Sequence, residues 1–173
     1  KKTEILQNFK TAISSTVRSI SNSENVEVTF GNKNSKSSNN SIKLPEIDQS
    51  NINNYHQIRA IADSESLKLR FSDLNIYKTY EPEGNISKKL YNIAEKIRYE
   101  KLGSEQFKGI RNNLENYYEE RINSLDLKSS EDKIVESFEN YFRSKFFNLK
   151  KNKEFETKLK VYKKDLDDKF KNK

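Results

Sequence analysis

Two pairs of carboxylates have spacings that could support acid–base chemistry or Mg²⁺ binding. Asp63 with Asp73, and Glu95 with Glu100, come closest to such an arrangement. Charged residues make up 34% of the chain, however, so pairs of this kind arise by chance on solvated helix faces. We therefore interpret these carboxylates as parts of a solvated surface.

The sequence has few of the residues that other kinds of reactive site require. His56 is the only histidine and the chain has no cysteine, so a proton shuttle or a zinc site would lack companions, and we expect His56 to be structural or exposed. The four glycines are scattered and form no phosphate-binding loop, and no serine stands in a nucleophile elbow. We predict no catalytic, cofactor-binding or metal-binding residue here, and the segment by itself does not read as an enzyme.

These carboxylates belong to two polar segments, residues 59–73 and 94–114, which also carry basic residues at helical spacings. Arg59 and Asp63 are four residues apart, and Ser66 and Arg70 repeat that spacing, so each pair would lie on one helix face. We interpret such pairs as a structural polar network or, alternatively, as partner contacts. The candidates are Arg59, Asp63, Arg70, Asp73, Arg98 and Glu100.

These residues must be positioned by helices, because apolar side chains recur mostly at helical spacing. The sequence predicts a mainly α fold: a helical bundle with a small β-hairpin near the N-terminus. Residues 3–21 form an amphipathic pattern, residues 26–30 alternate as a strand, and residues 42–45 would return as its partner. The intervening residues 31–41 are expected to be a flexible loop.

Helices are predicted over most of the chain after residue 53. In residues 67–71 (LKLRF) a helix is favoured over a strand, and a break is expected at residues 81–85 (EPEGN). Gly103 is expected to end one helix and Ser104 to cap the next, and Ser130 to cap another. We predict a domain over residues 1–125 and a basic helical extension, residues 126–173, that packs on it.

The net charge of +7 is confined to the end of the chain. Residues 143–173 contain 12 Lys/Arg and 5 Asp/Glu, which accounts for the whole excess, so residues 1–142 are neutral. This distribution argues against specific nucleic-acid binding. The apolar runs are too short for a membrane span, and the absence of cysteine fits a cytoplasmic protein.

Both polar segments resemble the N-terminal region of the CobT subunit of the aerobic ATP-dependent cobaltochelatase. In residues 59–73 an Arg leads into Ala-Asp-Ser, then Leu-x-Leu-Arg and an acidic residue. Residues 94–114 contain an E-x-x-R-x-E-x-L-G run, then a Gly and an Asn-Leu pair. The V-x-V-x-F strand and the Leu-Pro pair at residues 44–45 also agree, whereas Ser72 stands where the family is expected to have a histidine. The resemblance covers roughly residues 1–125.

The resemblance implies a role in a three-part machine. A CobS-like AAA+ ATPase hydrolyses ATP, and a large CobN-like subunit binds the corrin ring and inserts cobalt. This chain would be the non-catalytic scaffold that couples them; ATP, Mg and cobalt would be handled by the partners, and homo-oligomerisation stays open. Family members continue into a von Willebrand A-type domain whose D-x-S-x-S motif is absent here. The chain is therefore expected to be an N-terminal fragment or a shortened relative.

Two alternatives belong to other functional classes. The chain could be an adaptor for a MoxR-type AAA+ remodelling ATPase without a corrin substrate. It could also be a basic helical module that binds nucleic acid through residues 150–173, for which affinity would have to survive moderate salt.

Overall fold

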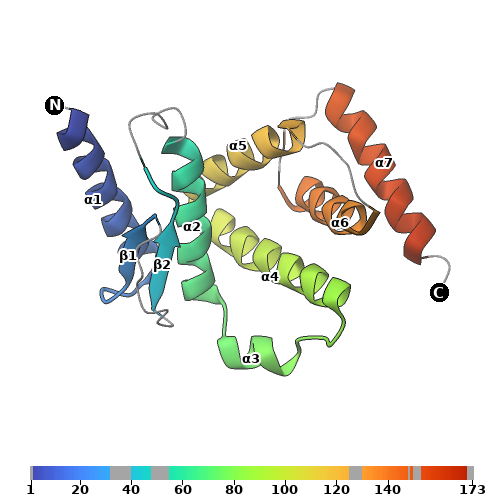
Figure 1. Ribbon diagram of the computed structural model, residues 1–173, viewed down its shortest axis with the longest axis horizontal. Helices are drawn as coiled ribbons and strands as arrows, with labels where there is room; N and C mark the ends of the chain where they lie inside the picture. Colours follow the sequence, from blue (N-terminus) through green and yellow to red (C-terminus); the bar gives the residue numbers. More distant parts are fainter. Residues whose placement is uncertain are drawn as a thin grey trace. The chain divides into compact units, whose positions relative to one another are not determined.

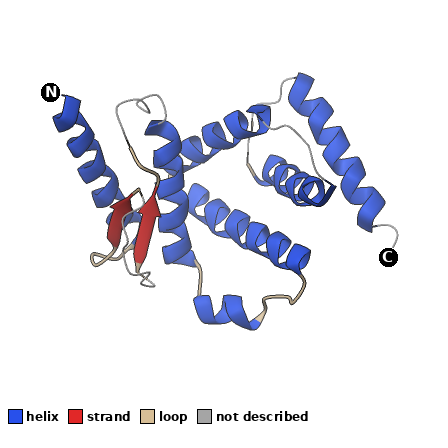
Figure 2. Cartoon of the chain, viewed as in Figure 1, coloured by secondary structure: helices blue, strands red, loops and turns tan. Residues whose placement is uncertain are grey.

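The computed structural model describes residues 2–31, 40–47, 55–124, 130–147, 149 and 153–170. These residues form seven helices and two strands (Figures 1 and 2). In chain order they are α1 (Lys2–Ser21), β1 (Glu27–Phe30), β2 (Ser41–Leu44), α2 (Tyr55–Phe71), α3 (Leu74–Thr79), α4 (Asn85–Gln106), α5 (Lys108–Ser124), α6 (Ser130–Phe146) and α7 (Lys153–Phe170). The mainly α fold with a small β element is confirmed. No helix among these residues is long and apolar enough to cross a membrane.

The chain divides into two compact units. The first comprises residues 1–72 and 102–114, and the second comprises residues 73–101 and 115–173. The predicted division into residues 1–125 and 126–173 stays a prediction.

The two strands of the first unit pair in parallel. Glu27 lies opposite Ser41 and Phe30 opposite Leu44. Both strands were predicted at these positions, but a hairpin requires antiparallel strands, so the predicted hairpin is wrong. Most of the predicted flexible loop, residues 32–39, lies outside the described residues; Ser41 itself belongs to β2.

The core of the first unit joins α1, both strands and α2. Its buried apolar residues are Ile13, Val17, Val26, Ile42, Leu44 and Ala62. In Figure 1, β2 lies between β1 and α2, and α2 contacts both β2 and α1. The apolar residues Ile13 and Val17 of the amphipathic α1 are buried, whereas Ile5 in its first turns is 58% exposed.

The helix predicted after residue 53 forms but is interrupted. Residues 67–71 are helical, as favoured, and α2 ends at Phe71. Asp73 then caps α3: its carboxylate accepts hydrogen bonds from the backbone N–H groups of Asn75 (2.8 Å) and Ile76 (3.1 Å). An acidic side chain satisfies two of the unpaired donors at the start of a helix, so this residue starts α3.

The predicted boundary at Gly103 and Ser104 is wrong, because α4 continues to Gln106. Gly103 instead allows close packing: a Cβ built there would lie 2.2 Å from Cδ2 of Leu67. Ser104 is buried, and its carbonyl accepts a hydrogen bond from Arg111 Nε at 3.0 Å. Only Phe107 separates α4 from α5.

The second unit contains α3, α6, α7 and parts of α4 and α5. Helices α6 and α7 contact each other, and α6 begins at Ser130; the predicted capping role of this serine stays a prediction. Tyr162 and Leu166 of α7 are buried. From α4 and α5, Ile97, Tyr118 and Ile122 are also buried in this unit.

Candidate functional site

Asp63 lies at the centre of a polar network in the first unit. Its side chain is almost completely buried, and Oδ1 accepts a hydrogen bond from Arg59 Nε at 3.2 Å, one turn earlier on α2. Oδ2 accepts a second bond, 2.6 Å long, from Asn113 Nδ2 on α5. The predicted Arg59–Asp63 pair is therefore confirmed, and it is extended by a residue from another helix.

Burial is the dominant influence on the acidity of Asp63. Desolvation raises the pKa of this carboxyl group, whereas the Asn113 hydrogen bond and the positive charge of Arg59 partly oppose that rise. Both oxygens are already bonded by the chain itself. This carboxylate fixes α2 against α5 within the unit and is not presented to a substrate.

Arg70 closes the end of α1. Its Nη1 donates a hydrogen bond to the Ile20 carbonyl at 2.9 Å, and its guanidinium lies 5.6 Å from the Phe71 ring and 5.5 Å from the Phe107 ring. A cation is favourable at a helix C-terminus because it interacts with unpaired carbonyls. The predicted pairing of Ser66 with Arg70 does not form; the Ser66 hydroxyl donates to the Ala62 carbonyl at 2.6 Å.

Glu100 is the buried carboxylate of the second unit, as Asp63 is of the first. Its Oε2 lies 2.5 Å from Arg143 Nη1, and both side chains are 0% exposed. Its Oε1 accepts a hydrogen bond from the buried Tyr118 hydroxyl at 2.7 Å. The guanidinium carbon of Arg143 also lies 3.5 Å from the centre of the Tyr118 ring. Three helices thus meet at one buried ion pair.

A second carboxylate completes this network. Glu139 accepts a hydrogen bond from Arg143 Nε at 3.0 Å and forms an ion pair with Arg121 at 3.2 Å. Burial alone lowers the pKa of Arg143, but the charge of Glu100 opposes it and the net pKa is raised. Burial, followed by the charge of Glu100, raises the pKa of Tyr118 well above its usual value. Arg143 therefore stays charged and Tyr118 stays a hydrogen-bond donor.

The remaining candidates lie nearer to the surface. Arg98 donates two hydrogen bonds of 2.7 Å to the Glu95 carboxylate three residues earlier on α4. Asp73 is the exposed cap of α3, and His56 is exposed in the first turn of α2. Among the described parts of the chain, no three His, Asp or Glu side chains come together as ligands for a metal ion.

The sequence prediction missed the partners of both buried carboxylates. Sequence patterns give Asn113 and Tyr118 no polar partner, and they place Arg143 only among the basic residues 143–173. The Glu139–Arg143 spacing of four residues was the available signal, since it places both side chains on one helix face. No local pattern connects Glu100 with a residue 43 positions later.

The comparison with known families supports the resemblance carried by residues 59–73 and 94–114. A family model described as cobalamin biosynthesis protein CobT matches residues 3–142, which is most of the chain and includes both segments. No solved structure matches it. Membership of this family implies involvement in cobalamin biosynthesis. The chain belongs to the CobT family.

Proposed function

We propose that this chain is a non-catalytic scaffold and coupling domain of a cobaltochelatase subunit. In this proposal it supports the ATP-dependent insertion of cobalt into a corrin ring. Its partners would be a CobS-like AAA+ ATPase and a CobN-like large subunit. ATP, Mg²⁺, the corrin and the cobalt substrate would be bound by those partners, in the cytoplasm.

One observation carries the scaffold role. Asp63 and Glu100, the buried carboxylates of the two family segments, are both bonded on each oxygen by side chains of this chain. A fully buried carboxylate whose two oxygens are bonded by the chain's own side chains is out of reach of an incoming metal ion unless that part of the core opens. The residues that mark the family thus hold each unit together.

The partner-contact role falls to residues that remain accessible. Arg59 and Arg98 have side chains that are 38% and 46% exposed, and each already forms one internal ion pair. An exposed guanidinium can also pair with a carboxylate of a partner protein. We therefore assign partner contacts to the exposed side of α2 in the first unit and, as a separate surface, to the exposed side of α4 in the second unit.

Reconstitution of cobalt insertion tests the proposal. The chain would be combined with its CobS-like and CobN-like partners, ATP and Co²⁺, and insertion into hydrogenobyrinic acid a,c-diamide would be followed by absorbance. Insertion should fall to background when the chain is omitted. Equal insertion with and without the chain would reject the role, and binding to the AAA+ partner with no effect on insertion would instead identify a remodelling adaptor.

Charge reversal separates coupling from folding. Arg98→Glu should reduce binding to the AAA+ partner while the melting temperature changes little, because its pair with Glu95 is partly exposed. Arg59→Glu would also break the bond to the buried Asp63 carboxylate, so it should destabilise the first unit and cannot separate the two effects. Lys89→Glu is the matched control, because Lys89 is also an exposed basic residue on α4. Loss of binding in the control variant as well would indicate a nonspecific charge effect and would contradict the assigned surface.

A further inference from the structure

The outer edge of β1 is open within the described residues. On the inner edge, the N–H of Glu27 donates to the Asn40 carbonyl (3.1 Å) and the N–H of Gly31 donates to the Leu44 carbonyl (2.9 Å). Because backbone groups alternate in direction along a strand, the N–H and C=O groups of Val28 and Phe30 point away from β2. No described residue pairs with them, and an unpaired edge of this kind is a template for another strand.

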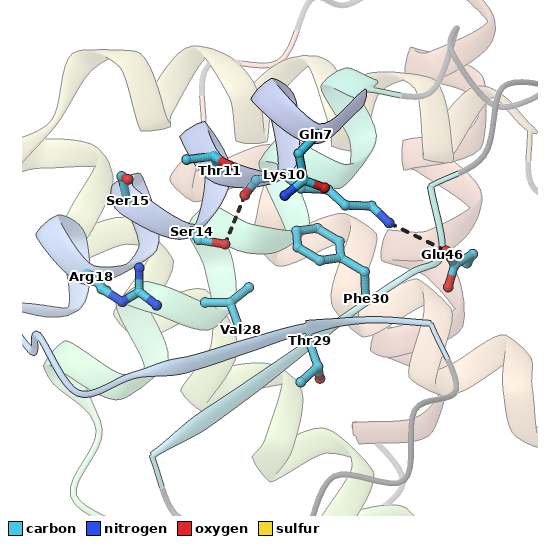
Figure 3. A pocket seen from close by; sticks show the side chains of 10 residues that line it. All are labelled: Gln7, Lys10, Thr11, Ser14, Ser15, Arg18, Val28, Thr29, Phe30 and Glu46. Atoms are coloured by element: carbon cyan, nitrogen blue, oxygen red, sulfur yellow. Dashed lines mark hydrogen bonds and ion pairs between the residues drawn. The ribbon is translucent and has the colours of Figure 1, made fainter. Parts of the chain in front are cut away.

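A pocket of about 490 Å³ runs between β1 and α1 (Figure 3). One wall is formed by Val28 and Phe30, whose side chains point toward α1. The wall from α1 consists only of polar side chains, with Lys10 near the Phe30 end and Arg18 near the Val28 end. The pocket therefore combines an apolar wall, a polar wall and an open backbone edge.

The charge of this pocket is positive and incompletely balanced. Lys10 Nζ lies 3.6 Å from Glu46, the only carboxylate in the lining, and 5.2 Å from the centre of the Phe30 ring. The Arg18 side chain forms no hydrogen bond or ion pair with the described part of the chain. A ligand for this pocket should therefore supply negative charge at the Arg18 end.

The two cations are spaced to match an extended chain. Lys10 and Arg18 are eight residues apart on one helix, which corresponds to roughly 12 Å along its axis. Four residues of an extended strand span roughly 13 Å, and residues four apart project to the same face. Two acidic side chains at positions i and i+4 of an added strand could therefore reach Lys10 and Arg18 together.

We propose that β1 and the polar face of α1 form a docking groove for an extended, acidic segment of a partner protein. This segment adds as a strand to the outer edge of β1, and its backbone bonds to Val28 and Phe30. Its acidic side chains, four residues apart, pair with Arg18 and Lys10. Backbone pairing of this kind gives affinity, whereas side chains at alternate positions give specificity. The groove does not depend on the cobaltochelatase proposal.

Glu46 acts in this scheme as an internal competitor. Its side chain is 60% exposed and lies over Gly31, where a built Cβ would meet the carboxylate. An incoming acidic residue would take its place on Lys10. Glu46→Gln should therefore tighten binding of an acidic segment a few-fold, since a neutral amide competes less strongly for the lysine.

The test uses the full chain and a synthetic peptide. A fluorescein-labelled nine-residue peptide of alternating Thr and Val, with Glu at two positions four apart, is titrated by fluorescence anisotropy. One control peptide carries Lys in place of Glu, and a second keeps the Glu residues but has N-methylated backbone amides on its pairing edge. The acidic peptide should bind at least about tenfold more tightly than either control.

Amide hydrogen exchange locates the bound peptide. The N–H groups of Val28 and Phe30 should exchange quickly in the free chain and gain protection when the acidic peptide binds. Those of Glu27 and Gly31, which are bonded already, should change little. Arg18→Glu should reverse the preference from the Glu peptide to the Lys peptide, which a misfolded variant could not do.

Three results would overturn the proposal. These are absence of binding at millimolar peptide, equal binding of the N-methylated peptide, and binding without protection of Val28 and Phe30. The last two would show a cationic surface that attracts acidic peptides without adding a strand. If Glu46→Gln leaves the affinity for the acidic peptide unchanged, the proposal that the peptide replaces Glu46 on Lys10 is wrong.

Discussion

The guanidinium carbon of Arg143 lies over the ring of Tyr118, 3.5 Å from its centre, and both side chains are buried. The Tyr118 hydroxyl and the Arg143 guanidinium also bond the same carboxylate, that of Glu100. One arginine is therefore fixed by two carboxylates and one aromatic face. A lysine could supply the charge but not the planar contact or the fork of donors.

Removal of one partner from this buried pair should be strongly destabilising. Arg143→Ala leaves the Glu100 carboxylate buried without its compensating positive charge, and we expect a loss of about 3–5 kcal/mol in the free energy of unfolding. Urea denaturation followed by circular dichroism measures the loss. Arg98→Ala is the control, because it breaks an exposed pair and should cost about 1 kcal/mol or less. Similar losses in the two variants would contradict the structural role of the buried pair.

Substitution of Gly103 tests the close contact between α4 and α2. Gly103→Ala places a Cβ 2.2 Å from Leu67 Cδ2, so we expect a loss of about 1–3 kcal/mol. Gly109→Ala is the matched control in α5, since nothing lies within 4 Å of its Cβ, and it should be neutral or slightly stabilising. In a double-mutant cycle, Leu67→Ala should reduce the cost of Gly103→Ala. Additive effects would show that the helices simply move apart.

Asp63→Asn should change how stability depends on pH. Burial raises the pKa of Asp63 above its unfolded value of 3.8, so the folded chain binds this proton more tightly than the unfolded chain. The stabilisation linked to this proton is complete below the unfolded pKa and is lost as the pH rises through the folded pKa.

The measurement is the difference in unfolding free energy between the wild-type chain and Asp63→Asn. It should shift in favour of the wild type as the pH falls from about 7 toward about 4. A shift in the opposite direction would mean that Arg59 and Asn113 outweigh burial and hold the pKa below its unfolded value.

Arg70→Met should weaken the end of α1. The variant keeps the aliphatic part of the side chain but loses the hydrogen bond to the Ile20 carbonyl and the contacts with two aromatic rings. We expect a loss of about 1 kcal/mol, measured by urea denaturation. Hydrogen exchange in the last turn of α1 should increase as well. Lys68→Met, at an exposed position of α2, should change neither the free energy of unfolding nor hydrogen exchange in α1.

Local rules account for the parts of this fold that the sequence predicted. The spacing of apolar residues located the helices, and a separation of four residues identified the Arg59–Asp63 pair. The same rules failed at Gly103, because a glycine that ends a helix and a glycine that admits Leu67 look identical in one sequence. Asn113 and Arg143 were out of reach since they contact residues 50 and 43 positions earlier.

The pairing of the strands failed for a related reason. Alternation in residues 26–30 identifies a strand but contains no information about the direction of its neighbour. Direction depends on the path of the connecting chain and on the packing of Ile42 and Leu44 into the core with Val26. Those contacts are tertiary, so the pattern of residues 26–30 and 42–45 could not distinguish a parallel pair from a hairpin.

The first unit is assembled from two separate stretches of chain, and this sets an order of events during synthesis. Asn113 leaves the ribosome 50 residues after Asp63, the carboxylate that it bonds. At a synthesis rate of roughly 5–20 residues per second, Asn113 is added about 3–10 s after Asp63. Until then α2 has neither Asn113 nor the groove that Gly103 provides for Leu67. A nascent chain halted after residue 72 should therefore stay sensitive to proteases, and one extended past residue 114 should become resistant.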